Sequence, residues 1–131
     1  MQIDGLRQEL QALDARPPHV ARLLAAWSRG QLLATADRDA AVALPRRLRE
    51  ALPGLQARLD ALVTLRSEHP AADGSARWLL GLRDGRAIEA VLLPREGVCV
   101  SSQVGCAVGC GFCMTGRDGV QRQVSDAEII A

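Results

Sequence analysis

Apolar residues recur three and four positions apart in the N-terminal part of the sequence. Leu6, Leu10 and Leu13 would share one face of a helix. The same spacing recurs further along the chain, so residues 5–14 and 18–29 are both predicted to form amphipathic helices.

Glycine and proline mark where these helices end. Gly30 suits a left-handed C-terminal stop for the second helix. A weaker third helix is predicted over residues 35–43. Leu44-Pro45 interrupts it, because the residue before a proline avoids the helical region. Residues 45–52 should then form a short helix that ends at Pro53 and Gly54.

The hydrophobic period changes after the helical part. Residues 59–66 alternate in a β-compatible pattern, although a helix remains open as far as Val63. Two apolar runs, residues 76–82 and 87–93, flank an Asp-Gly pair, which is a strong short-range signal for a hairpin.

One further strand is predicted over residues 98–104, directly before a glycine-rich segment. Ser125 and Glu128 have the spacing of a capping box, so a helix should begin at Asp126. We therefore predict three regions: a helical accessory domain (1–56), a β-hairpin and linker region (57–96) and a last region with the cysteine-rich loop (97–131).

Three of the four cysteines form a C-x3-C-x2-C group: Cys106, Cys110 and Cys113. The glycines between them disfavour a helix and suit a loop that bends round a small object. Thiolates ligate iron-sulfur clusters, and three ligands would leave one iron open to a substrate or cofactor. Three alternatives stay open: a structural zinc site, a closed site completed by Cys99, and unpaired buried thiols.

Charge gives little guidance about partners. Sixteen basic and fifteen acidic residues leave a net charge of +1, which excludes attraction of nucleic acid by a bulk field. All the basic residues are arginines, which suits RNA binding but equally suits a bias of genome composition. Arg46, Arg47 and Arg49 lie on the short helix predicted over residues 45–52, and a charged helix face of this kind is usually just solvated.

The sequence shows no secretory signal pattern and no apolar stretch of the roughly 18 residues that a membrane span needs. We therefore predict a cytoplasmic protein with no membrane partner. In that compartment clustered cysteines are metal ligands more often than disulfides.

The cysteine group and its surroundings resemble a known family. Phe112 precedes the last cysteine of the group, and the run from Cys99 to Cys106 reads Cys-Val-Ser-Ser-Gln-Val-Gly-Cys. These motifs are similar to those of radical S-adenosylmethionine (SAM) methyltransferases that methylate C2 of an adenine in 23S ribosomal RNA and in some tRNAs. The resemblance covers roughly residues 78–131 well and the N-terminal part loosely.

The resemblance implies an α/β fold: a small N-terminal helical domain, then a β-hairpin, then the start of a truncated radical SAM (β/α) barrel. It implies a [4Fe-4S] cluster on Cys106, Cys110 and Cys113, with SAM as the second cofactor. Phe112 would lie near the cluster or the SAM adenine, although burial in an ordinary core is an equal alternative.

The resemblance also assigns two residues outside the cysteine group. Glu89 matches the proton-accepting glutamate, although strand alternation alone would turn it to solvent. Cys99 matches the thiol that resolves a protein-RNA adduct through a transient disulfide with a methyl-carrying cysteine.

The resemblance implies that the helical domain binds RNA, with Arg46, Arg47 and Arg49 as candidate phosphate contacts. The implied partners are 23S rRNA, tRNA and an electron donor such as a flavodoxin-type protein, and we expect a monomer. The sequence looks like the N-terminal portion of such an enzyme, inactive by itself. The alternative is a non-catalytic iron-sulfur or zinc-binding fragment, or another radical SAM enzyme.

Overall fold

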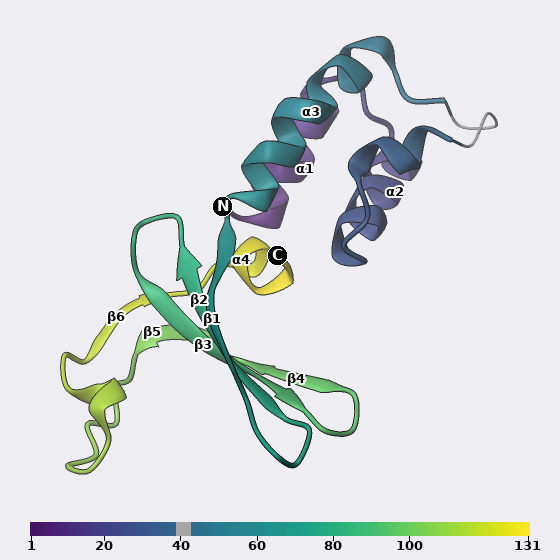
Figure 1. Cartoon of the computed structure of the whole chain (residues 1–131). Helices are drawn as coiled ribbons and strands as arrows, with labels where there is room; N and C mark the ends of the chain where they lie inside the picture. The colour runs from purple at the N-terminus through teal and green to yellow at the C-terminus, as the bar shows by residue number, and fades with distance from the viewer. Residues whose placement is uncertain (39–42) are drawn as a thin grey trace. The chain divides into compact units, whose positions relative to one another are not determined.

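The structure is a computed structural model that describes residues 1–38 and 43–131. The chain divides into two compact units (Figure 1). The first comprises Met1–Leu62 with Ile130–Ala131, and the second comprises Val63–Ile129. Each is described by itself.

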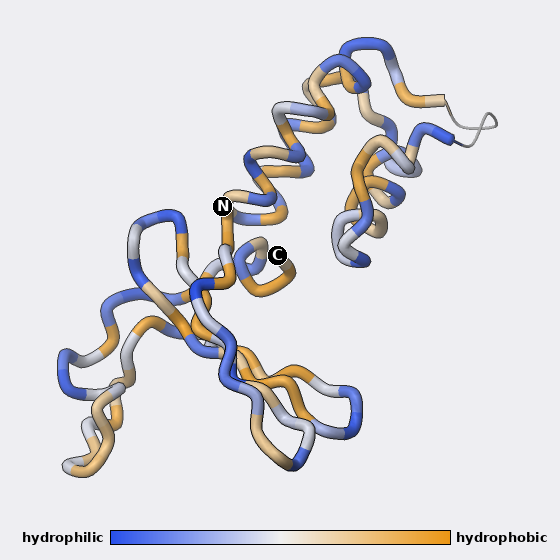
Figure 2. The backbone as a smooth tube through the Cα atoms, viewed as in Figure 1, coloured by the Kyte–Doolittle hydropathy of each residue, from blue (hydrophilic) through white to orange (hydrophobic). Residues whose placement is uncertain are grey.

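The first unit is helical. Its elements are α1 (Ile3–Ala12), α2 (Pro17–Ser28), the 3-10 helix η1 (Leu33–Asp37) and α3 (Arg46–Asp60). The two helices predicted over residues 5–14 and 18–29 are therefore confirmed. Figure 2 shows hydrophobic and hydrophilic positions alternating along these helices, as amphipathic packing requires.

The ends of α2 follow from local hydrogen bonding. His19 is buried, and its Nδ1 accepts the Arg16 backbone N–H at 3.1 Å, which satisfies a donor at the helix start. At the other end Gly30 has φ +65, and its N–H donates to the Trp27 carbonyl at 2.9 Å. The predicted glycine stop is confirmed.

Two helix predictions are wrong in part. In place of the weaker helix predicted over residues 35–43, the structure has the short η1, which ends at Asp37. Residues 39–42 lie outside the described residues. The helix predicted over residues 45–52 continues through Pro53 to Asp60. Its buried stripe consists of four leucines: Leu48, Leu52, Leu55 and Leu59. Burying each leucine is worth about 1.5–3 kcal/mol, which together outweighs the roughly 3 kcal/mol that an interior proline costs.

The second unit contains a four-stranded antiparallel sheet. Its strands, in spatial order, are β1 (Val63–Pro70), β2 (Ala76–Leu82), β3 (Ala87–Leu93) and β4 (Gly97–Val100). The hairpin predicted around the Asp-Gly pair is confirmed as β2 and β3. Gly85 supplies φ +86 in the turn, and the Leu82 N–H donates to the Arg86 carbonyl at 2.8 Å.

The single strand predicted over residues 98–104 is wrong. The chain forms two strands that belong to different sheets: β4 pairs with β3, while β5 (Gln103–Gly105) pairs with β6 (Val120–Gln123). The break falls at Ser101, whose N–H and hydroxyl both donate to the Glu89 carbonyl, at 3.1 and 2.8 Å. All strand pairs among the described residues are antiparallel, so the barrel stays a prediction.

A small apolar core joins the two sheets. It consists of Leu82, Ile88, Val104 and Val124, with Val63 and Leu80 packed against it. The chain then enters α4 (Asp126–Ile130) through the predicted capping box. The Ser125 N–H donates to Glu128 at 2.9 Å, and the Glu128 N–H donates to the Ser125 hydroxyl at 3.4 Å, so the capping box is confirmed.

Among the described residues, no helix combines the length and apolar character that crossing a bilayer requires.

Candidate functional site

The cysteine group lies on a long loop, residues 106–119, that connects β5 to β6 (Figure 1). Cys106 is half-buried, while Cys110 and Cys113 are exposed, and all three are free thiols. The prediction that this segment is a loop rather than a helix is confirmed for the part that bears the cysteines. A short 3-10 helix, η3 (Met114–Gly116), follows Cys113 directly.

Two of the three thiols share one hollow. Cys110 and Cys113 line a depression of about 540 Å³ together with Gly109, Gly111, Met114, Gly116 and Arg117. Cys106 is not one of its lining residues. Within residues 1–38 and 43–131, the structure brings no three His, Cys, Asp or Glu side chains close enough to hold one metal ion.

The donor set itself suits an iron-sulfur cluster. Thiolates are the ligands such clusters use, and the loop offers three on a backbone with little side-chain bulk. A hydrogen bond from the Thr115 hydroxyl, helped by backbone donors, lowers the pKa of the Cys113 thiol. A lowered pKa favours the ligating thiolate form.

Glycines bring the two limbs of the loop together. Gly105 has φ +84, and a Cβ there would lie 2.0 Å from the Gly119 carbonyl oxygen. A Cβ on Gly116 would lie 3.1 Å from the Gly109 backbone. The base of the loop and its middle are therefore closed by backbone contacts that a side chain would disrupt.

Phe112 is 94% exposed, so it belongs to no core in this structure. Val108 and Met114, on the same loop, are 76% and 73% exposed. The tip of the loop thus presents apolar side chains next to its thiols. Burial of Phe112 as an ordinary core residue, which the sequence left open, does not occur here.

Glu89 and Cys99 lie on the same face of the four-stranded sheet. Cys99 on β4 pairs with Val91 on β3, and Glu89 is two residues before Val91. Side chains two residues apart on a strand point to the same side of the sheet, so Glu89 is the diagonal neighbour of Cys99. The Cα atoms of such neighbours lie roughly 7–8 Å apart. Both residues are exposed, and the Glu89 carboxylate lies 3.6 Å from the Arg77 guanidinium.

This arrangement bears on the two assignments differently. Glu89 is exposed, as alternation along β3 predicts. The structure brings Glu89 and Cys99 near one another from separate strands, which sequence spacing could not show. Among the residues that the structure describes, neither side chain has a hydrogen bond or ion pair with a loop cysteine.

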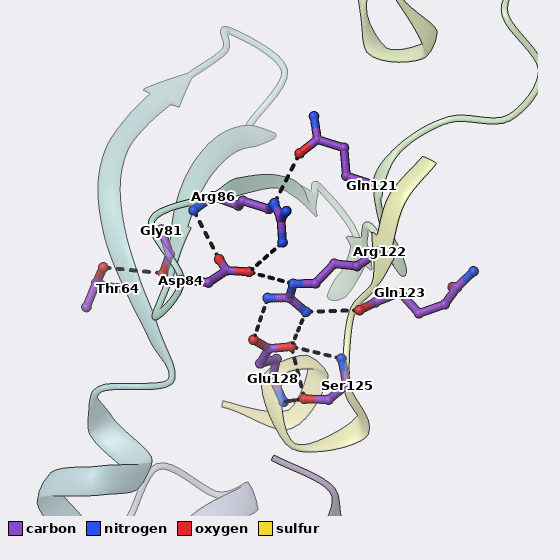
Figure 3. Close-up of polar contacts among 9 residues, drawn as sticks. All are labelled: Thr64, Gly81, Asp84, Arg86, Gln121, Arg122, Gln123, Ser125 and Glu128. Carbon is purple, nitrogen blue, oxygen red and sulfur yellow. Dashed lines mark hydrogen bonds and ion pairs between the residues drawn. The ribbon is translucent and has the colours of Figure 1, made fainter. Parts of the chain in front are cut away.

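A polar network next to the loop was missed by sequence reasoning (Figure 3). Both terminal nitrogens of Arg122, on β6, donate hydrogen bonds to the Glu128 carboxylate, at 2.8 and 2.9 Å. The Nε of Arg122 donates a hydrogen bond to Asp84 at 2.7 Å. Arg86 donates to Asp84 at 3.0 Å and to Gln121 at 3.1 Å. The network joins the β2–β3 turn, β6 and α4.

The charges in this network stabilise one another. The hydrogen bond from Arg122 lowers the pKa of Glu128 to about 2, and that of Asp84 to about 2 as well. Glu128 and then Asp84 raise the pKa of Arg122 through their hydrogen bonds. The capping box indicated Glu128 in the sequence, but nothing local indicated that Arg122 and Asp84 would meet it.

The three arginines predicted as phosphate contacts already have acidic neighbours. Arg46 lies 2.7 Å from Glu50, Arg49 lies 2.8 Å from Asp37, and Arg47 lies 3.8 Å from Asp14. These pairs favour the interpretation as a solvated, salt-bridged helix face. An RNA contact by this face stays a prediction.

Known proteins resemble the whole chain. It is 54% identical over 133 residues to a "Probable RNA methyltransferase" of Ectopseudomonas mendocina, and 56% identical over 131 residues to one of Thiobacillus denitrificans. Both alignments cover 100% of this chain but only 38% and 36% of those proteins. The chain therefore spans just over a third of the length of the curated relatives it matches.

A solved structure is also similar. A crystal structure of a radical SAM methyltransferase from Sphaerobacter thermophilus superposes with a TM-score of 0.60 and 33% identity. The match covers 99% of this chain and 39% of that one. No protein-family model matches the chain.

Proposed function

We propose that this chain is part of a radical SAM methyltransferase that acts on RNA, at C2 of an adenine in 23S rRNA and in some tRNAs. The observation that carries the proposal is the loop of residues 106–119, with three free thiols in C-x3-C-x2-C spacing. Two kinds of relative support it, since one is named for RNA methylation and the other for radical SAM chemistry.

In this proposal Cys106, Cys110 and Cys113 hold a [4Fe-4S] cluster. The bound cluster and SAM supply the radical chemistry that an electron-poor ring carbon requires. The chain's own part is to hold the cofactors on the glycine-rich loop and to present apolar side chains beside them. Phe112 is the proposed neighbour of the SAM adenine, because an aromatic ring can stack on a base.

The exposed face of the sheet supplies the other two groups. Glu89 is the proposed acceptor of the C2 proton of adenine. Cys99 is the proposed thiol that frees the RNA from a covalent adduct, by forming a disulfide with a second cysteine. As the S–S bond forms, the carbon–sulfur bond between that second cysteine and the base-bound carbon breaks, and the carbon keeps the electron pair and takes up a proton. The two roles act on the same adduct, so their diagonal placement on β3 and β4 favours this assignment.

The proposal implies three partners: 23S rRNA, tRNA and a flavodoxin-type electron donor. The net charge of +1 means that RNA affinity would depend on local contacts. Arg77 is suited to such a contact, because it is exposed beside Glu89.

The test uses a chimera in which this chain replaces the matching part of the Ectopseudomonas mendocina relative. The chimera is incubated anaerobically with SAM, a reductant and unmodified 23S rRNA, and the digested RNA is analysed by mass spectrometry. We expect methylation at adenine C2 in the chimera and none in its Cys110→Ala variant. Methyl groups found only at another atom would refute the C2 assignment.

The matched variant Cys99→Ala separates the two kinds of cysteine. It should still cleave SAM while RNA accumulates in covalent complex with the protein, because a resolving thiol acts only after the adduct forms. Release of methylated RNA at the wild-type rate from Cys99→Ala would remove Cys99 from the mechanism.

A further inference from the structure

The cysteine loop is attached to its unit through two very short strands. β5 has three residues and β6 has four, and their register shifts between Val104 and Gly105. An isolated two-stranded hairpin is marginally stable in water. The pairing of β5 with β6 therefore needs support from elsewhere if the loop is to keep a fixed base.

Apolar packing supplies part of that support at one side. Val104 and Val124 are buried in the small core with Leu82 and Ile88. Most residues of β6 itself are exposed, however, and Val120 is 36% exposed. The apolar core therefore fixes Val124, directly after β6, more firmly than it fixes the residues of β6 itself.

Side-chain hydrogen bonds hold β6 at two neighbouring residues, Gln121 and Arg122, and those of Arg122 reach carboxylates on two other elements. The arginine's guanidinium makes two hydrogen bonds to Glu128 on α4, one to Asp84 in the β2–β3 turn and one to the backbone carbonyl of the next residue, Gln123 (Figure 3). Glu128 is only 8% exposed, while the Arg122 side chain is 25% exposed, so the carboxylate end of this pair is the part that is shielded from solvent. Shielded, forked arginine-carboxylate bonds are stronger and more directional than exposed ion pairs.

The hydrogen bonds of Arg122 lie close to the base of the cysteine loop. Arg122 pairs across the hairpin with Val104, and the first loop cysteine, Cys106, is two residues beyond Val104. One guanidinium therefore fixes β6 against two other elements at the point where the loop leaves the hairpin. Neither acidic partner belongs to the loop.

We propose that Arg122 is a positioning residue that, through Asp84 and Glu128, keeps the base of the cysteine loop closed before any cluster is bound. The inference rests on the proposed function only for the reason why a closed base matters, which is that it would hold the three thiols ready to bind iron. The closed base itself does not depend on the proposed function, because it forms in the protein without any metal.

The experiment compares three variants by hydrogen-deuterium exchange of the 131-residue chain without metal. Arg122→Met removes the hydrogen bonds of Arg122 to Asp84 and Glu128. Asp84→Asn removes the charge of one partner and retains an oxygen acceptor, which serves if Arg122→Met does not fold. Arg83→Met is the control, since it removes the same charge from an exposed arginine of the β2–β3 turn.

We expect Arg122→Met to speed exchange roughly tenfold or more in peptides that cover residues 103–105 and 120–124, since it removes the charge-assisted hydrogen bonds of Arg122 to Asp84 and Glu128. Asp84→Asn should speed exchange there less, and Arg83→Met should leave it unchanged. Peptides from β1 and β2 should exchange at the wild-type rate in all three. Iron uptake during anaerobic reconstitution should fall in Arg122→Met, although all three cysteines remain.

Two results would overturn the inference. One is unchanged exchange at residues 103–105 and 120–124 in both Arg122→Met and Asp84→Asn. The other is faster exchange spread evenly over the whole sheet, which would make Arg122 a general stabiliser. Failure of the wild-type chain to take up iron would count against the proposed function only, because the exchange result does not depend on it.

Discussion

Replacing Gly105 by alanine should open the base of the cysteine loop. Gly105 has φ +84, and an added Cβ would lie 2.0 Å from the Gly119 carbonyl oxygen and 3.1 Å from its carbon. Both obstacles are backbone atoms, which cannot rotate away as a side chain can. The alanine can be accommodated only if β5 and β6 separate locally.

The magnitude follows from two contributions. A left-handed backbone costs a non-glycine residue about 1–2 kcal/mol. Separation of Gly105 from Val120 adds one or two lost hydrogen bonds, each worth about 0.5–1.5 kcal/mol net. We expect Gly105→Ala to lower the free energy of unfolding of the second unit by about 1.5–5 kcal/mol. Gly119→Ala is the matched control: its φ is +66 but nothing lies within 4 Å of its Cβ, so it should lose only the first contribution.

The two units can be followed separately because each has one tryptophan, Trp27 in the first and Trp78 in the second. In a Trp27→Phe background, urea unfolding monitored by Trp78 fluorescence reports on the second unit. Equal losses in Gly105→Ala and Gly119→Ala would show that the close approach of Gly105 to Gly119 does not limit the fold.

Three further predictions follow from other parts of the chain. Asp84 and Glu128 have folded pKa values of about 2, below their ordinary 3.8 and 4.5. Their ionised forms therefore stabilise the second unit above pH 4.5, and this stability should be lost as the pH falls from about 4.5 to about 2. Urea midpoints across that range should fall less in Glu128→Gln, and parallel curves would contradict the linkage. Pro53→Ala should stabilise the helical unit by roughly 1–3 kcal/mol, measured by urea unfolding with Trp27 as reporter, because it restores a donor inside α3; a decrease would show that α3 needs the proline. Thr115→Val should slow alkylation of Cys113 by iodoacetamide near neutral pH, as quantified by peptide mass spectrometry, because the hydroxyl that lowers the thiol pKa is lost; an unchanged rate would remove Thr115 from that role.

Local signals in the sequence predicted much of this structure. The Asp-Gly turn predicted the β2–β3 hairpin, the leucine spacing predicted α1, and the Ser125–Glu128 pair predicted the start of α4. Each of these signals acts over a few residues. The physical cause of each of these elements therefore lies within the same few residues that carry the signal.

The errors and omissions arise from distant contacts. α3 continues through Pro53 because its leucines are buried by packing, which outweighs a local break. The strand predicted over residues 98–104 splits because its two parts pair with different strands, residues 97–100 with β3 and residues 103–105 with β6. Arg122 reaches Asp84 over 38 positions, and no local pattern marks such a pair. The place of Glu89 beside Cys99 likewise depends on the register of β3 with β4.

The central claim is that Cys106, Cys110 and Cys113 hold an iron-sulfur cluster, and metal analysis tests it most directly. The chain is expressed with both iron and zinc available, reconstituted anaerobically with iron and sulfide, and analysed for all three elements. We predict roughly four iron and four sulfide per chain, lost in Cys110→Ala and retained in Cys99→Ala. Stoichiometric zinc without iron, or equal loss of iron in Cys99→Ala and Cys110→Ala, would contradict the account.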